Sequence, residues 1–149
     1  MDGRAKVTGQ TKFADDLVLP RMLFCKLLRS PHPHATIVSI DGSAARKAPG
    51  VKLVLTGDDF PIPYGIMPVS RDEHALCRGT VRHVGDPVAA VVAASEWQAA
   101  EALGLIEVAY QPLPTIDSPE EALAHPEARI HEYGEGGNIH RIAHLAFGD

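Results

Sequence analysis

Hydrophobic residues along this chain gather in short runs that proline and glycine separate, a pattern that predicts a domain built from many short elements. Bulky and β-branched side chains mark six of these runs as strands, at residues 22–28, 35–40, 51–55, 81–84, 88–94 and 105–110. The run at residues 88–94 is apolar at every position, as in a strand that is covered on both faces. We therefore expect it to be the central strand.

Serine residues mark where two of the three predicted helices begin. Ser95 and Ser118 are each followed three residues later by glutamine or glutamate, which is the pattern of a capping box. The two helices are expected to end near Leu103 and Ala124, and a third helix of one to two turns is expected at residues 44–48. All three helices are therefore short.

The order of the elements predicts how they are connected. A strand, a helix and a strand follow one another over residues 88–110, so we expect a right-handed crossover between two parallel strands. The whole pattern predicts an α/β (α+β) fold in which a mixed β-sheet is packed by short helices.

Composition and charge narrow the classes of protein that fit. The 149 residues are 45% hydrophobic, enough for one core, and the formal net charge is −5 with the basic residues scattered. This excludes a typical nucleic-acid-binding surface. No apolar run approaches the roughly twenty residues of a membrane-spanning helix, and the N-terminus lacks the apolar segment of a signal peptide. We expect a cytoplasmic protein without a membrane partner, whose two cysteines are free thiols.

One pair of histidines and one loop cluster are the candidates for chemistry. His32 and His34 in the stretch RSPHPHA could be metal ligands, but alternate residues of an extended chain diverge and zinc needs three or four converging ligands, so a turn between strands is favoured. Residues 72–74 (DEH) and Cys77 resemble a metal or thiol site. The thiol has no electropositive setting, however, which favours a surface or interface loop over catalysis.

Several motifs in order suggest a family. They are MDGRAKVTG at the N-terminus, MLFCKLLRSPHPHATIVSID, APGV, GDD, DE, VRHVGDPVAAVVA and VAYQPLPTI. This series resembles the N-terminal a/b hammerhead domain of the molybdenum hydroxylase large subunits, the xanthine dehydrogenase and aldehyde oxidase family. Residues 64–93 are similar to the same region of 4-hydroxybenzoyl-CoA reductase α subunits and of related bacterial dehydrogenases.

The resemblance implies cofactors and partners. Large subunits of this family hold molybdopterin, often as the cytosine dinucleotide, while iron–sulfur clusters and FAD lie in partner subunits or domains. The family's active-site residues belong to the domains that follow the hammerhead. No catalytic, cofactor-binding or metal-binding residue is therefore assigned to this chain, and we expect no cofactor in it and no activity from it alone.

The domain boundary follows from the same resemblance. Residues 1–125 are expected to form the hammerhead domain, and residues 126–149 a linker and the truncated start of the molybdopterin-binding domain. The function indicated is a scaffold that contacts the remaining domains of the large subunit and the iron–sulfur and FAD subunits. Two alternatives are a stand-alone module for binding or subunit interaction, and, least favoured, a small metallohydrolase that uses His32, His34 and His74.

Overall fold

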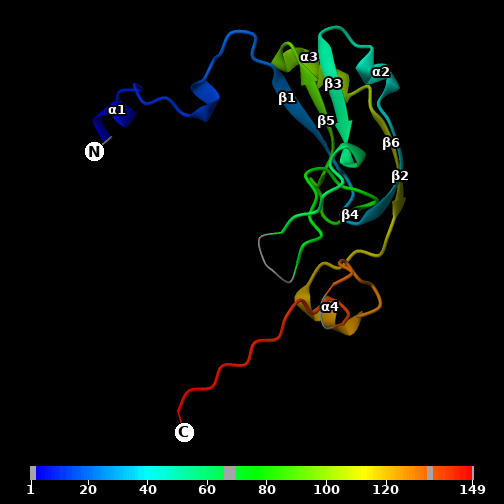
Figure 1. The fold of residues 1–149 in the computed structure, drawn as a ribbon. Coiled ribbons are helices and arrows are strands. Elements are labelled where there is room, and N and C mark those ends of the chain that lie inside the picture. Colours follow the sequence, from blue (N-terminus) through cyan, green and yellow to red (C-terminus); the bar gives the residue numbers. More distant parts are fainter. Residues whose placement is uncertain (1–2, 66–69, 134–135, 149) are drawn as a thin grey trace.

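The computed structural model describes residues 3–65, 70–133 and 136–148, and it contains two three-stranded antiparallel sheets (Figure 1). In order across each sheet, the strands are β1 (Phe24–Arg29), β5 (Pro87–Ala93) and β3 (Val51–Thr56), and then β4 (Thr80–Val81), β2 (Ala35–Asp41) and β6 (Glu107–Pro112). The helices are α1 (Gly3–Val7), α2 (Ser43–Arg46), α3 (Glu96–Leu103) and α4 (Pro119–Ala124), with 3-10 turns η1 (Ala14–Asp16) and η2 (Gly57–Asp59). The predicted α/β class with short helices is confirmed.

Strand β5 lies at the centre of the first sheet, as predicted from its apolar sequence. Val91 is fully buried and lies opposite Lys26 of β1 and Val54 of β3. Ala99 and Ala102 of α3 pack against the same core, where their small side chains let the helix backbone approach the sheet closely. The helix begins as predicted, because the Ser95 hydroxyl accepts a hydrogen bond from the Gln98 amide.

The expected parallel crossover is wrong. Strand β6 lies in the second sheet, where it pairs antiparallel with β2, and every strand pair in the described part of the chain is antiparallel. Both edges of β5 are already hydrogen-bonded, to β1 and β3, so no edge is left for β6. After α3 the chain passes Ile106, which joins the core, and then crosses to the other sheet.

The predicted strand at residues 81–84 is shorter in the structure and forms β4 at residues 80–81. Its ladder with β2 stops because the Arg82 amide donates to the Asp86 carboxylate (2.8 Å) rather than to a neighbouring strand. Gly85 then takes a positive φ of 93°, which closes the turn into β5. A side chain therefore ends a strand that its own sequence would continue.

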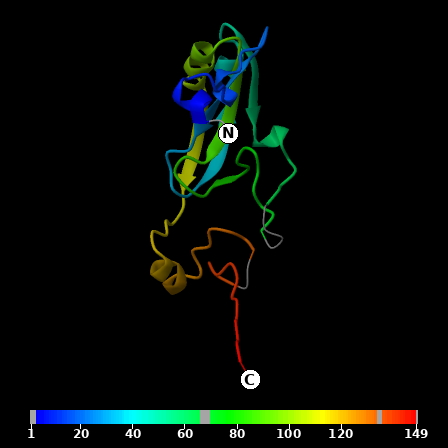
Figure 2. The same ribbon diagram turned by 90° about the vertical axis from the view of Figure 1, so that its left-hand side faces the viewer.

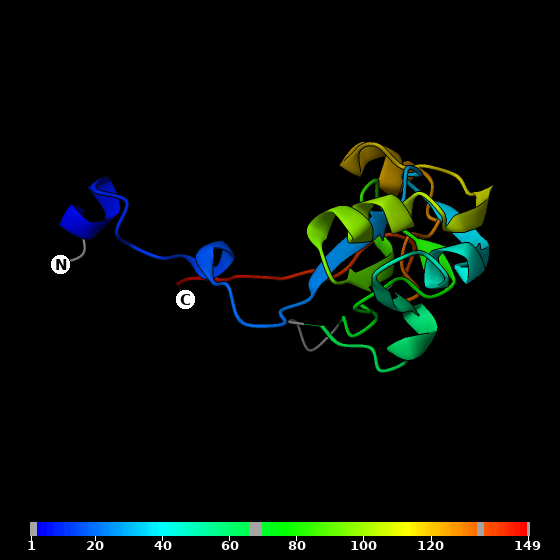
Figure 3. The same cartoon turned by 90° about the horizontal axis from the view of Figure 1, so that it is seen from above.

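The two ends of the chain leave the body of the domain. Residues 3–23 form an arm that contains α1 and η1, and residues 141–148 form an extended tail; both project to the same side of the sheets (Figures 1 and 3). Helix α4 and the segment after it lie beyond one end of the sheets (Figure 2). In the described ranges, no helix has the length and apolar character needed to cross a bilayer.

Candidate functional site

The stretch RSPHPHA forms the turn between β1 and β2, which is the interpretation that its sequence favoured. The His34 ring is buried, and its Nδ1 donates to the Pro114 carbonyl (2.7 Å). The His32 ring instead lies against Tyr110, with 4.8 Å between ring centroids. The two histidines thus contact different groups, and the described residues include no cluster of three or more His, Cys, Asp or Glu side chains suited to a metal ion.

The same turn is tied to the loop before β5. Ser30, also buried, exchanges backbone hydrogen bonds with this loop, donating to Asp86 and accepting from Gly85, each at 2.8 Å. Its hydroxyl also accepts from the His32 amide (3.0 Å). These contacts make the histidine turn a structural junction between the two sheets.

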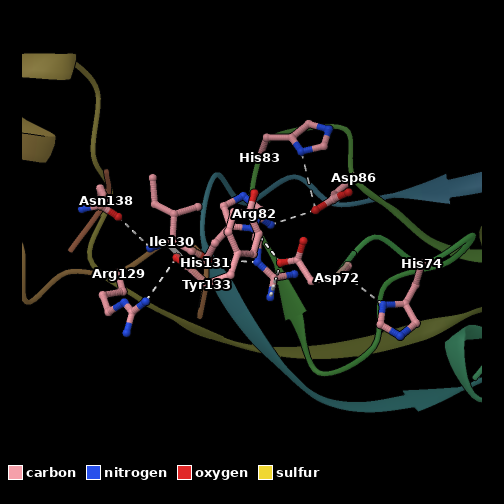
Figure 4. Close-up of polar contacts among 10 residues, drawn as sticks. All are labelled: Asp72, His74, Arg82, His83, Asp86, Arg129, Ile130, His131, Tyr133 and Asn138. Carbon is pink, nitrogen blue, oxygen red and sulfur yellow. Dashed lines mark hydrogen bonds and ion pairs between the residues drawn. The ribbon is translucent and has the colours of Figure 1, made fainter. Parts of the chain in front are cut away.

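Polar side chains from distant parts of the chain meet beside this junction (Figure 4). The Asp72 carboxylate accepts from His131 Nδ1 (2.7 Å) and lies 4.0 Å from the Arg82 guanidinium. Its second oxygen, Oδ1, is buried without a hydrogen-bond partner among the described residues. Asp72 and His131 stand 59 positions apart in sequence, so only the tertiary fold brings them together.

The predicted cluster of residues 72–74 and Cys77 is divided in the structure. His74 donates to the backbone carbonyl of Asp72 (3.2 Å), and its ring points away from the Asp72 carboxylate (Figure 4). Glu73 pairs through its backbone with Tyr64. The four residues line one cavity of about 380 Å³, but they do not converge on a common point as a nucleophile and its base would.

Cys77 lies in surroundings that keep its thiol protonated. Burial is the largest cause that raises the pKa of this thiol, from an ordinary value of 9.0 to about 12, and the negative charge of Asp86 and a hydrogen bond to it raise the pKa further. Arg82 opposes these effects only in part. Because the thiolate is the reactive form, Cys77 is not an activated nucleophile at neutral pH.

Ile130, in the segment after α4, is hydrogen-bonded both by Arg82 and by a residue of its own segment, Asn138. Arg82 Nε donates to the Ile130 carbonyl (2.9 Å), and the Ile130 amide donates to Asn138 Oδ1 (3.0 Å). Asn138 Nδ2 in turn donates to the Ala128 carbonyl (3.1 Å). We call Asp72, Arg82, Ile130, His131 and Asn138 the latch, since together they hold residues 128–133 and 136–138 against the loop before β5.

Arg82, His131 and Asn138 carry no sequence signal that joins them in one site, and none of them was predicted as a site residue. Arg82 stands in a strand-like run, and His131 and Asn138 lie in a segment expected to be a linker. Glycine followed by asparagine, as at residues 137–138, is common in ordinary turns. The local sequence therefore does not indicate that the side chain of Asn138 hydrogen-bonds to several separated backbone groups. Gly134 and Glu135 of that linker lie outside the described residues.

Comparison with known proteins agrees with the fold. The family model for the aldehyde oxidase and xanthine dehydrogenase a/b hammerhead domain matches residues 8–114, well over half of the chain. The chain belongs to this family. The family that the ordered motifs predicted is thus confirmed, and the matched residues contain both sheets and α3.

Relatives of this hammerhead domain are much longer than the chain itself. It is 47% identical over 150 residues to a probable xanthine dehydrogenase subunit of Bacillus subtilis, a match that covers 99% of this chain and 20% of that protein. It is 40% identical over 153 residues to the nicotinate dehydrogenase large molybdopterin subunit of Eubacterium barkeri, covering 100% of this chain and 34% of the relative. The chain therefore spans between a fifth and a third of these relatives.

Solved structures give the same result. The crystal structure of quinoline 2-oxidoreductase from Pseudomonas putida 86 superposes with a TM-score of 0.80 and 40% identity, over 88% of this chain and 18% of that one. The aldehyde oxidoreductase from Desulfovibrio gigas superposes with a TM-score of 0.79 and 31% identity, over 88% and 16%. The hammerhead fold is thus shared across enzymes whose names give different substrates.

Proposed function

We propose that this chain is the scaffold domain of the molybdopterin-binding large subunit of a molybdenum hydroxylase-type oxidoreductase, and that chemistry takes place elsewhere in that subunit. One observation carries the proposal: the Bacillus subtilis and Eubacterium barkeri relatives match the chain along at least 99% of its length, yet the chain covers only 20–34% of theirs. The site supports this division of labour, because its thiol is protonated and its histidines bond to backbone or carboxylate groups.

The latch suits a positioning role. Residues 1–125 are proposed as the hammerhead domain, and residues 126–149 as the linker and first part of the molybdopterin-binding domain. Arg82 and Asp72 come from the hammerhead side, and Ile130 and His131 from the other. A hydrogen-bonded contact of this kind fixes the direction in which the chain leaves the scaffold, and so the placement of the next domain.

The residues of the site do not fit the cofactor that the family implies. Molybdopterin carries phosphate, which is bound by backbone amides, arginine and lysine. The cavity beside the latch is instead lined by the carboxylates of Asp72, Glu73 and Asp86, with Arg82 already engaged. We propose that molybdopterin binds outside this chain. From the resemblance to the family we also propose that it is the cytosine dinucleotide, and that iron–sulfur clusters and FAD lie in partner subunits or domains of a cytoplasmic complex.

A chimeric subunit tests the proposal. The matching 150 residues of the Bacillus subtilis relative are replaced by this chain, and the purified chimera is assayed for molybdenum by mass spectrometry and for oxidoreductase activity. We expect both to be retained within a few-fold of the parent, and the 149-residue chain alone to bind no molybdenum. Stoichiometric molybdopterin on the isolated chain would overturn the division of labour.

The genomic sequence downstream of the codon for Asp149 distinguishes the proposed scaffold from the main alternative, a free-standing interaction module. An in-frame continuation of several hundred codons beside small- and medium-subunit genes is expected for the scaffold of an enzyme, 4-hydroxybenzoyl-CoA reductase being one candidate. A stop codon without such neighbours would favour a free-standing interaction module.

A further inference from the structure

The N-terminal arm, residues 3–23, carries large apolar side chains that the domain itself does not cover. None of its residues is buried, and six large hydrophobic side chains between positions 7 and 23 are 46–85% exposed: Val7, Phe13, Leu17, Val18, Leu19 and Leu23. Scattered exposed hydrophobic residues are common on protein surfaces, but such a density on one extended segment marks an interaction surface.

The arm does not fold back to hide these side chains. Between the arm and the edge of the first sheet lies a cavity of about 450 Å³, whose lining includes Leu17 and Met22 of the arm and Phe24 of β1. At the base of the arm, the Met22 amide donates to the Leu19 carbonyl (3.1 Å) in a turn that holds Arg21 at a φ of 63°. Pro20 stands at the second position of this turn, where its fixed φ is favourable, so the direction of the arm is set locally.

The C-terminal tail presents a similar surface on the same side of the molecule. Ile142, Leu145 and Phe147 are 50–93% exposed. The tail leaves the body on the same side as the arm (Figure 3), but from the opposite end of the molecule, where it runs downward in Figure 1. In Figure 2, viewed from that side, the arm lies in front of the sheets and the tail runs down the page beyond α4. A body as long as the sheets and α4 together, lying along this side, would contact both the arm and the tail.

We propose that the arm is a docking segment whose apolar side chains are covered by the molybdopterin-binding part of the same large subunit. This inference rests on the proposed function, in which the tail leads into that part. A separate protein bound to the arm would compete for the same side of the domain with the part of the subunit that follows the tail. The Bacillus subtilis and Eubacterium barkeri relatives match over at least 99% of this chain, so the arm belongs to the segment that these two share with it. Permanent contacts within one subunit are the apolar kind that these side chains suit.

Trypsin cleavage of the arm tests the proposal, because Lys12 and Arg21 lie within it and are exposed. The arm is expected to be cut rapidly in the isolated 149-residue chain and at least tenfold more slowly in the Bacillus subtilis chimera. The triple variant Phe13→Ser, Leu17→Ser, Leu19→Ser should restore rapid cleavage in the chimera. It should leave the thermal unfolding of the isolated chain unchanged, since these side chains are themselves exposed there.

A matched control uses exposed hydrophobic residues of the body. Val38→Ser, Leu53→Ser and Val84→Ser remove side chains that are 53–63% exposed, and this variant should keep the arm protected in the chimera. A chimera that contains molybdenum but whose arm is cut as fast as in the isolated chain would overturn the docking role alone. An insoluble or molybdenum-free chimera would overturn the proposed function instead. If the isolated chain forms a dimer and the arm variant dissociates it, the arm docks on a second copy of this chain and not on the rest of the large subunit.

Discussion

Truncation of Val91 measures how far the fold depends on the central strand. Val91 lies on the strand between β1 and β3, and its fully buried side chain belongs to the core that α3 covers. Val91→Ala removes two methyl groups, at about 0.8 kcal/mol each for the lost transfer free energy, plus a term for the cavity that remains. We expect the free energy of unfolding to fall by about 2–3 kcal/mol, a large share of the total for a domain of this size.

Urea denaturation followed by circular dichroism measures this loss. With a slope of roughly 2 kcal/mol per M, the midpoint of Val91→Ala should fall by about 1–1.5 M at an unchanged slope. Val38→Ala is the control, because Val38 is 62% exposed on β2 and should shift the midpoint by less than about 0.3 M.

Val91→Asp makes the same position a sharper test. It places a carboxylate in the apolar core that α3 covers, where Lys26, opposite on β1, is already paired with Glu96. This costs roughly 4 kcal/mol or more and should leave the chain unfolded or insoluble. A soluble Val91→Asp protein that unfolds cooperatively within about 0.5 M urea of the parent would refute the assignment of β5 to the core.

Three further predictions address the latch, the buried thiol and a close backbone approach. Asn138→Leu removes hydrogen bonds worth about 1 kcal/mol each. Hydrogen exchange of the backbone amides in the latch should therefore accelerate at least tenfold, while the urea midpoint changes little. An unchanged exchange rate would contradict the latch. Because the pKa of Cys77 is raised from 9.0 to about 12, its contribution to stability is full below pH 9 and is lost as the pH rises towards 12. In a Cys25→Ser background, replacing Cys77 by alanine should lessen this decline, the remainder coming from Tyr110, whose pKa burial also raises. Alkylation of Cys77 at pH 8 should be slow. A Cβ at Gly57 would lie 2.4 Å from the Cys77 carbonyl oxygen, so Gly57→Ala should cost about 1–3 kcal/mol, whereas Gly104→Ala, 3.4 Å from its nearest neighbour, should be tolerated in the same melting experiment.

Local signals predicted most elements because their causes are local. Runs of apolar residues marked five of the strands closely, and Ser95 and Ser118 marked the starts of α3 and α4 through hydrogen bonds that span three residues. The central position of β5 also followed from its own composition, because only a strand covered on both faces tolerates seven apolar residues in succession.

Pairing partners required the tertiary structure. The sequence around β5, α3 and β6 fits a parallel crossover as well as it fits the observed path to a second sheet, since the choice depends on which strands already occupy the edges of β5. The short β4 is a similar case: Asp86 captures the amide of Arg82 and stops a ladder that the side chains at positions 81–84 would support.

The chain by itself thus determined the class of fold and the strand that forms the core, because these depend on composition and on the spacing of neighbouring residues, and its ordered motifs indicated the family by resemblance. The tertiary structure decided the antiparallel arrangement, the latch and the exposure of the arm. Each of these depends on contacts between residues that are distant in sequence, such as Asp72 and His131, or on the exposure that the fold leaves to Phe13 and Leu17 within the described chain. Hydrophobic and charged groups act over a few ångströms, so their partners are known only when the fold places them side by side.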